Sequence, residues 1–181
     1  MEHHTRIGAI LDPTTRAAAL PNASDDDLII AAISRNADPI YPGRDESIAA
    51  LDLALLVLHA KTPNGFERVL REALRWVSAE LLINALTELH GRNPRTADLD
   101  PVQYLLRMPN GQTAITVCCV ELASRKWLRA ETELLGRLVA VSTDIAMLED
   151  ITGHGSSVTD AARSRLMLLD PLSEVARRNP A

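Results

Sequence analysis

Apolar residues recur at helical spacing along most of the chain, and short polar turns separate the apolar stretches. The segment Ser24-Asp25-Asp26-Asp27 predicts the start of a helix that runs to about residue 35. Ser24 can cap free amides there, and carboxylates favour the positive end of a helix dipole. After a turn at Tyr41-Pro42-Gly43, the next helix is predicted over residues 45–60, with an apolar stripe of Ile48, Leu51, Leu55 and Leu58.

The strongest periodic signal lies between Phe66 and Leu89, where apolar side chains recur every three to four residues. It predicts one long amphipathic helix of about six turns, which follows a break at Pro63-Asn64-Gly65. Later helices, interrupted at Pro109-Asn110-Gly111, are predicted over residues 101–106, 112–124, 130–151 and 159–169. No alternating pattern is long enough to build a sheet, so the sequence predicts an all-α fold in a single domain over residues 1–181.

The composition agrees with a helical core. Aromatic residues make up only 3% of the chain, so the core must consist of Leu, Ile, Val and Ala, which favours helices over a sandwich or barrel. The two cysteines, Cys118 and Cys119, are adjacent in an apolar run, and neighbours do not readily form a relaxed disulfide. We interpret them as small buried side chains of a protein in a reducing compartment.

The charge and hydropathy of the chain exclude some partners. The net charge is −5, and residues 1–60 carry all of it, with nine carboxylates against four arginines. Without a basic field, nucleic acid is not an expected partner. No apolar run approaches the roughly 18 residues that cross a bilayer, and the first residues lack the pattern of a signal peptide. The sequence therefore predicts a cytoplasmic protein without a membrane span.

The order of motifs after Phe66 carries a family resemblance. A stretch with Trp76 leads to the polar loop Gly91-Arg92-Asn93-Pro94, then to Tyr104-Leu105-Leu106-Arg107, and then to Arg107-Met108-Pro109-Asn110-Gly111. In this order the chain resembles, over about residues 40–158, the carboxyl half of bacterial class I terpene synthases. The resemblance implies an antiparallel helical bundle that corresponds to part of the class I terpenoid synthase fold.

The resemblance assigns roles to the helix break at residues 107–111. It implies that Arg107 senses and binds the substrate diphosphate, and that Asn110 stands in the linker position usually held by Asp. Gly111 would be the effector, whose carbonyl acts at the break. The chemistry suits these residues, because arginine offers a planar fork to phosphate oxygens and a broken helix exposes backbone groups. The alternative is an ordinary turn with a solvated Arg107.

A second motif of the family, the metal-binding pattern Asn-Asp-x-x-Ser-x-x-x-Glu, is best matched by residues 149–157. Asp150 is retained, Glu149 supplies another oxygen donor, Gly153 replaces the Ser, and Ser157 stands where the family has Glu. Helical geometry places Glu149 near the edge of the apolar stripe, so it is the better ligand for Mg²⁺, which prefers hard oxygen donors. The alternative is a solvated pair of acids at a helix end.

The family's other metal motif is an aspartate-rich DDxxD or DDxxE on an early helix. Asp25 and Asp26 supply the leading acids, but neither is followed by an acid at the fifth position. The alternative for Asp25-Asp26-Asp27 is helix capping, which the preceding Ser24 favours.

Three functions remain open from the sequence. The first is a terpene synthase-like lyase that uses Mg²⁺ to ionise and cyclise an isoprenyl diphosphate, in a homo-oligomer or with a completing second chain. The second is a catalytically inactive or truncated helical protein of that fold that acts as a binding or oligomerisation partner. The third is an unrelated helical module. Few aromatic side chains are present to stabilise a carbocation through cation–π contacts.

Overall fold

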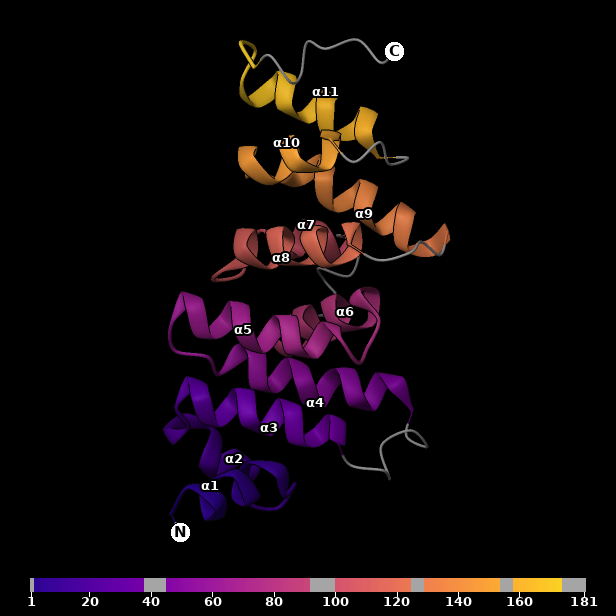
Figure 1. Cartoon of the computed structure of the whole chain (residues 1–181). Coiled ribbons are helices and arrows are strands. Elements are labelled where there is room, and N and C mark those ends of the chain that lie inside the picture. The colour runs from indigo at the N-terminus through magenta and orange to yellow at the C-terminus, as the bar shows by residue number, and fades with distance from the viewer. Residues whose placement is uncertain (1, 38–44, 92–99, 125–128, 154–157, 174–181) are drawn as a thin grey trace. The chain divides into compact units, whose positions relative to one another are not determined.

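The structure is a computed structural model that describes residues 2–37, 45–91, 100–124, 129–153 and 158–173. Every regular element within these ranges is a helix, which confirms the predicted all-α fold (Figure 1). Within the same ranges, no helix has the length and apolar character needed to cross a membrane.

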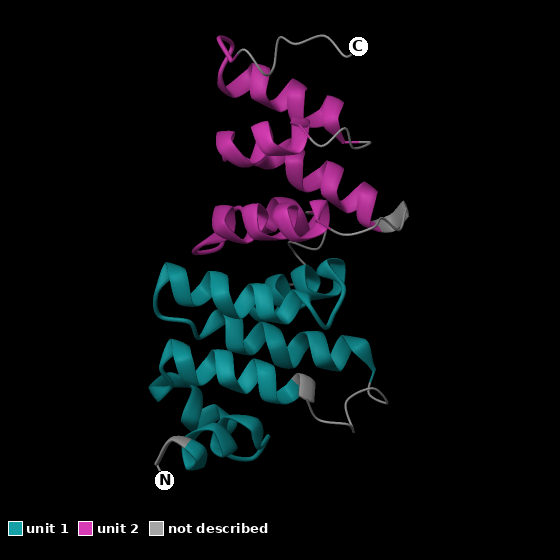
Figure 2. Cartoon of the chain, in the orientation of Figure 1, with its two compact units in different colours: residues 1–99 teal, residues 100–181 magenta. Residues whose placement is uncertain are grey.

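The chain forms two compact units, residues 1–99 and residues 100–181 (Figure 2). The prediction of one helical domain over residues 1–181 stays a prediction. Unit 1 contains α1 (Glu2–Leu11), α2 (Arg16–Ala19), the 3-10 helix η1 (Leu20–Asn22), α3 (Asp25–Ala37), α4 (Glu46–Leu58), α5 (Pro63–Leu74) and α6 (Ala79–Leu89). Unit 2 contains α7 (Pro101–Leu105), α8 (Gly111–Ala123), α9 (Arg129–Val141), α10 (Ile145–Gly153) and α11 (Thr159–Leu169).

The helices α1, α3 and α5 pack side by side in unit 1. Near the start of α3, Asp27 accepts a hydrogen bond of 3.4 Å from Arg6 of α1. Near the end of α3, Arg35 donates a hydrogen bond of 2.7 Å to the carbonyl of Leu11, where α1 ends. Along α1, Arg6 comes before Leu11, and along α3 their partners Asp27 and Arg35 follow in the same order. The two helices therefore run in the same direction. The first turn of α3 in turn binds the start of α5 through Asp25.

The helices α4 and α6 form a second layer of unit 1. Each packs more extensively against the other than against any further helix, and α4 also contacts α3 and α5. A carboxylate oxygen of Glu46 accepts a hydrogen bond of 2.9 Å from the backbone N–H of Ser78, so the first turns of α4 and α6 lie together. Apart from Phe66, the buried apolar side chains described in unit 1 are aliphatic, as the composition predicts, and include the fully buried Leu28, Leu53, Leu70, Leu74, Leu82 and Leu86.

The buried Arg16 forms hydrogen bonds with both the end of α1 and α4. Arg16 donates hydrogen bonds of 3.0 and 3.2 Å to the carbonyls of Ile10 and Leu11, and one of 2.6 Å to Asp52. Arg35 forms a second ion pair with Asp52 at 3.5 Å. The guanidinium groups satisfy carbonyls at a helix end and complement the negative end of its dipole.

In unit 2, as in unit 1, helices pack against one another and side chains form hydrogen bonds with the backbone of other helices or of the segments before them. The helix α8 is buried over most of its length, as its apolar sequence predicts, and packs against α9. The side chain of Gln112, in the first turn of α8, accepts a hydrogen bond of 3.2 Å from the backbone N–H of Thr143, just before α10. The helix α11 packs against α9 and α10, and its Arg165 donates to the carbonyl of Ser142 at 2.8 Å.

The prediction of one long helix over residues 66–89 is wrong, because the structure divides this segment into α5 and α6. Val77 is buried at helical spacing after Leu74, so the apolar period continues across the break. The break lies at Ser78, whose backbone is extended with ψ 144° and whose hydroxyl accepts a hydrogen bond from the N–H of Leu81. A serine N-cap can therefore interrupt a helix without interrupting its apolar stripe.

The structure also corrects two other predicted helix boundaries. The helix predicted over residues 130–151 is divided into α9 and α10, and Asp144 caps α10 by accepting a hydrogen bond of 3.1 Å from the N–H of Met147. The break predicted at Pro63-Asn64-Gly65 is also wrong in its position, because Pro63 is the first residue of α5. Thr62 is the N-cap there, and proline is favoured at the first helical position because its missing N–H would have no partner.

Candidate functional site

The turn between α7 and α8 interrupts the helix where the sequence predicts. Asn110 adopts a left-handed conformation with φ 60°, and its side chain does not cap α8. Gly111 is buried against the carbonyl oxygen of Leu105, and a Cβ atom at this position would overlap that oxygen. Glycine is therefore required here by the close approach of two backbone segments.

Arg107 lies on this turn with its side chain exposed. Its backbone N–H donates to the carbonyl of Tyr104 at 2.9 Å, and the next residue, Met108, is buried and anchors the turn. An exposed arginine in the turn before a helix suits contact with an anion. The roles of Arg107, Asn110 and Gly111 in diphosphate binding and catalysis stay predictions.

The late acids lie on α10 in unit 2. Glu149 is half-buried, and one of its carboxylate oxygens accepts a hydrogen bond of 3.4 Å from the hydroxyl of Ser173. Asp150 is exposed on the same helix. Ser157, the third predicted metal ligand, lies outside the described residues.

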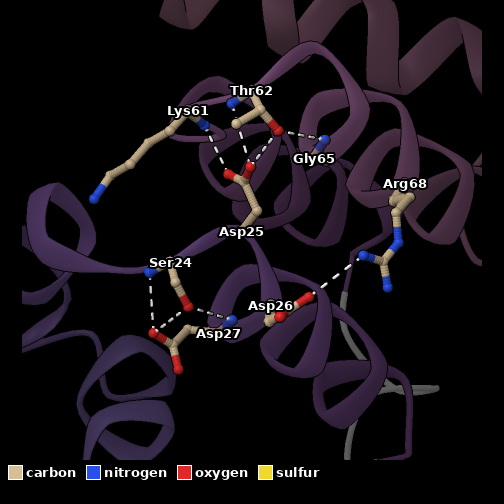
Figure 3. A network of polar contacts seen from close by, with 8 residues as sticks. All are labelled: Ser24, Asp25, Asp26, Asp27, Lys61, Thr62, Gly65 and Arg68. Carbon is tan, nitrogen blue, oxygen red and sulfur yellow. Dashed lines mark hydrogen bonds and ion pairs between the residues drawn. The ribbon is translucent and has the colours of Figure 1, made fainter.

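The early acids all take part in polar contacts within unit 1 (Figure 3). Asp25 accepts hydrogen bonds from the backbone N–H groups of Lys61 and Thr62 at 2.7 and 3.2 Å, and from the hydroxyl of Thr62 at 2.6 Å. Asp26 forms an ion pair with Arg68 of α5 at 3.3 Å. Both contacts join α3 to α5.

Asp27 is buried and forms a capping box with Ser24, which confirms the predicted cap. The hydroxyl of Ser24 accepts a hydrogen bond from the N–H of Asp27, and the carboxylate of Asp27 accepts from the N–H and the hydroxyl of Ser24 at 2.9 and 2.7 Å. The sequence analysis predicted Ser24 as the cap; the reciprocal bond between the N–H of Ser24 and the carboxylate of Asp27 was not predicted.

Hydrogen bonds hold two of these carboxylates in the charged form. Burial raises the pKa of Asp25, but the bonds from Thr62 and Lys61 outweigh it and lower that pKa below its ordinary value. Burial likewise raises the pKa of Asp27, and its bonds from Ser24 and its contact with Arg6 lower it further than burial raises it.

The surroundings of the early acids suit hydrogen bonding better than Mg²⁺ binding. The oxygens of Asp25 face N–H and O–H donors, whereas Mg²⁺ needs carboxylate lone pairs directed into a site with room for water. On α10, Glu149 offers one oxygen donor of the kind that Mg²⁺ prefers. Among the residues that the structure describes, no three His, Cys, Asp or Glu side chains gather as a metal site would require.

Sequence reasoning missed the contacts that join alternate helices. Asp25 binds the start of α5, Glu46 binds the start of α6, and Gln112 binds the segment before α10. In each case a side-chain oxygen from the first turn of one helix accepts a backbone N–H at the start of the helix two further along. We name these contacts the N-terminal hooks. The only local signal is an acceptor in a first turn, which ordinary helices also carry.

The cysteines are buried as predicted. Cys118 and Cys119 on α8 are both free thiols, and burial raises the pKa of Cys119 above its ordinary value. A thiol in such surroundings is a poor nucleophile.

Comparisons of the chain with protein-family models, with curated proteins and with solved structures gave no match.

Proposed function

We propose that this protein is a helical binding protein, in which stacked helical hairpins present a surface to a protein partner. The observation that carries the proposal is the set of N-terminal hooks, which align alternate helices in both units. Stacks of helical hairpins are the architecture of α-solenoids, which bury a core between neighbouring repeats and bind partners on extended concave surfaces.

The contacts of the three aspartates at the start of α3 support the same function. Asp25 and Asp27 are committed to contacts that position α3, and Asp26 pairs with a side chain of α5. These residues serve packing, and their carboxylates are oriented by protein donors. Packing residues of this kind are what a scaffold requires, whereas a diphosphate-ionising enzyme needs acids directed toward metal ions.

The test is to find the partner and rebuild the complex. Cross-linking of the tagged full chain in its own cells, followed by mass spectrometry, should identify one protein that is recovered reproducibly. Calorimetry with that purified protein should then show stoichiometric binding, and light scattering should show whether the partner is a second copy of this chain. A chain that stays monomeric and binds none of the cross-linked proteins after purification contradicts the proposal.

A second candidate function is Mg²⁺-dependent ionisation of an isoprenyl diphosphate, and the turn at residues 106–111 favours it. The chain breaks between α7 and α8 at residues 106–110, and Arg107 is exposed there, which supports the role that the resemblance implies for Arg107. In this function Arg107 would bind the diphosphate, and Glu149 with Asp150 would help to hold Mg²⁺, which neutralises the leaving group.

The test of the second candidate is direct. The purified chain is incubated with Mg²⁺ and geranyl, farnesyl or geranylgeranyl diphosphate, and released pyrophosphate and hydrocarbons are measured. Turnover that Arg107→Ala abolishes and that the exposed-arginine control Arg75→Ala retains would establish this function. Absence of pyrophosphate release rules it out for these substrates.

A further inference from the structure

The sequence holds two pairs in which asparagine precedes glycine, Asn64-Gly65 and Asn110-Gly111. Such pairs deamidate more readily than other asparagine sites, because glycine has no side chain to keep its backbone nitrogen from the carboxamide. Both asparagines are exposed, and both glycines are buried in the first turn of a helix, α5 or α8. The backbone conformation at each pair therefore decides whether the glycine nitrogen can reach the carboxamide.

Deamidation at Asn110 needs water and no cofactor. The backbone nitrogen of Gly111 loses its proton to solvent and attacks Cγ of Asn110. The bond from Cγ to the side-chain nitrogen breaks, and that nitrogen takes up a proton and leaves as ammonia. Water then opens the cyclic succinimide at one carbonyl to give aspartate, or at the other to give isoaspartate, in which the backbone runs through the side chain. One water is consumed and one ammonia is released.

The turn between α7 and α8 keeps the nitrogen of Gly111 away from the carboxamide. Asn110 has ψ 18°, so this nitrogen is turned toward the backbone nitrogen of Asn110 and away from its side chain. The peptide group between the two residues is held at both ends. Its N–H donates to the carbonyl of Met108 at 3.0 Å, and its carbonyl accepts from the N–H of Ala114 at 2.9 Å. Closure of the succinimide ring requires rotation about ψ, which turns this peptide group out of both bonds.

The isoaspartate product does not fit the closed turn. Gly111 is buried, and a Cβ atom on it would overlap the carbonyl oxygen of Leu105. Isoaspartate inserts one methylene group into the backbone directly before Gly111, where the chain has no room for an added atom. Aspartate leaves the backbone length unchanged, and like asparagine it tolerates the left-handed conformation of residue 110. The two products should therefore have different effects on the turn.

We propose that Asn110-Gly111 is a modification site controlled by the turn between α7 and α8. The closed turn protects Asn110, opening of the turn permits its deamidation, and isoaspartate at this position prevents the turn from closing again. A transient local opening thereby becomes a permanent change at the start of α8. This property does not depend on the proposed binding function.

The first test compares the two asparagines in the full chain. The protein is incubated in mildly alkaline buffer with and without urea, and peptide mass spectrometry follows the deamidation of Asn110 and Asn64. In urea both should react at similar rates. In the folded chain Asn110 should react at least about tenfold more slowly than in urea, because opening the turn costs two hydrogen bonds. Equal rates for Asn110 with and without urea overturn the proposal.

Two substitutions in the turn test whether its opening controls the reaction. Met108 is buried, whereas Leu106 is 36% exposed. Met108→Ala removes a buried anchor and should accelerate deamidation of Asn110 in the folded chain at least about fivefold, whereas Leu106→Ala should change it less than about twofold. Met108→Val replaces Met108→Ala if circular dichroism shows the latter to be unfolded. The rate at Asn64 should stay unchanged in each folded variant. Equal acceleration of both asparagines, or equal effects of the two substitutions, overturns control by the turn.

Hydrogen exchange separates the effects of the two products. A chain with Asn64→Gln is aged in urea, so that Asn110 is its only asparagine before glycine, and is then returned to buffer. After exchange and digestion, chromatography separates the peptides with isoaspartate, aspartate and asparagine. Residues 105–114 should exchange at least about tenfold faster in the isoaspartate form than in the intact form, and an Asn110→Asp variant should exchange like the intact form. Exchange in the isoaspartate form that is as slow as in the intact form overturns the permanent opening.

Discussion

Asp25 and Thr62 are 37 residues apart in the chain, and a hydrogen bond of 2.6 Å from the Thr62 hydroxyl to the Asp25 carboxylate joins the first turns of α3 and α5. Asp25→Ala removes this bond and the two from backbone N–H groups. We expect a loss of about 2 kcal/mol in the free energy of unfolding, because charged acceptors contribute more than neutral ones. Urea denaturation measures this loss.

The neighbouring Asp26 provides a matched control. It also lies in the first turn of α3, but its side chain is 73% exposed and forms a surface ion pair with Arg68. Asp26→Ala should therefore cost only about 0.5 kcal/mol. Equal losses for the two variants would show that the contact with α5 does not stabilise unit 1.

Gly65 is the second part of the same contact. A Cβ atom at Gly65 would overlap the carboxyl group of Asp25, so Gly65→Ala must displace Asp25 from its donors. We expect the substitution to cost about 2 kcal/mol in the wild-type chain and clearly less in an Asp25→Ala chain. A double-mutant cycle by urea denaturation measures the difference, and strictly additive losses would contradict the overlap.

The largest effect of a single polar substitution is expected at Asp52. Its carboxylate pairs with Arg16 and Arg35, whose side chains are only 10% and 11% exposed. Asp52→Asn leaves two nearly buried guanidinium groups without their carboxylate. We expect a loss of about 3 kcal/mol, because an uncompensated charge in the interior is costly.

Thermal and urea denaturation of the Asp52→Asn variant test this expectation. Asp150→Asn, at an exposed position of α10, is the control for loss of one carboxylate and should cost about 0.5 kcal/mol or less. An Asp52→Asn chain as stable as this control would mean that carbonyl groups alone satisfy the two arginines.

Local signals explain what the sequence predicted of the fold. The cap at Ser24, the break at Gly111 and the last helix over residues 159–169 all depend on residues within a few positions of one another. The break at Ser78 was missed because the buried Val77 continues the apolar period across it. The break at Asp144 was missed because Val141 and Ile145 keep the apolar spacing in the sequence, although Ile145 is 39% exposed in the structure. A period identifies the buried face, and it does not show whether one helix or two supplies that face.

For the candidate site too, the sequence predicted the features that depend on neighbouring residues and not those that depend on distant ones. The turn that carries Arg107 was predictable because proline, asparagine and glycine dictate it locally. The contact between Asp25 and Thr62 was not, because any first-turn acid has the same local pattern whether it binds solvent, a metal or a distant backbone. Which helix lies beside which is a property of the packed core, and the N-terminal hooks become visible only after α3 and α5 are side by side.

The cysteines should be unreactive in the folded chain. Burial raises the pKa of Cys119, and Cys118 is equally inaccessible. We expect neither thiol to react with iodoacetamide at about pH 8, where an ordinary exposed thiol is partly ionised, and both to react in urea. Mass spectrometry counts the labels, and rapid labelling without urea would show that α8 is not buried.

The acid stability of the chain should depend on Asp27. Hydrogen bonds from Ser24 and the contact with Arg6 lower its pKa in the folded state, although burial opposes them. A carboxyl group with a lowered folded pKa contributes stability above its unfolded pKa, about 3.9, and this contribution is lost as the pH falls through the folded value. Asp25 acts in the same direction.

We therefore expect the free energy of unfolding to be nearly constant between about pH 7 and pH 5 and to fall steeply below about pH 4. Asp27→Asn preserves the shape of the side chain but not its charge, so the variant should be less stable at neutral pH and lose less stability on acidification. The double variant Asp25→Asn/Asp27→Asn should show the flattest profile. Urea denaturation at a series of pH values measures these slopes, and an Asp27→Asn profile as steep as that of the wild type would mean that other carboxylates control acid unfolding.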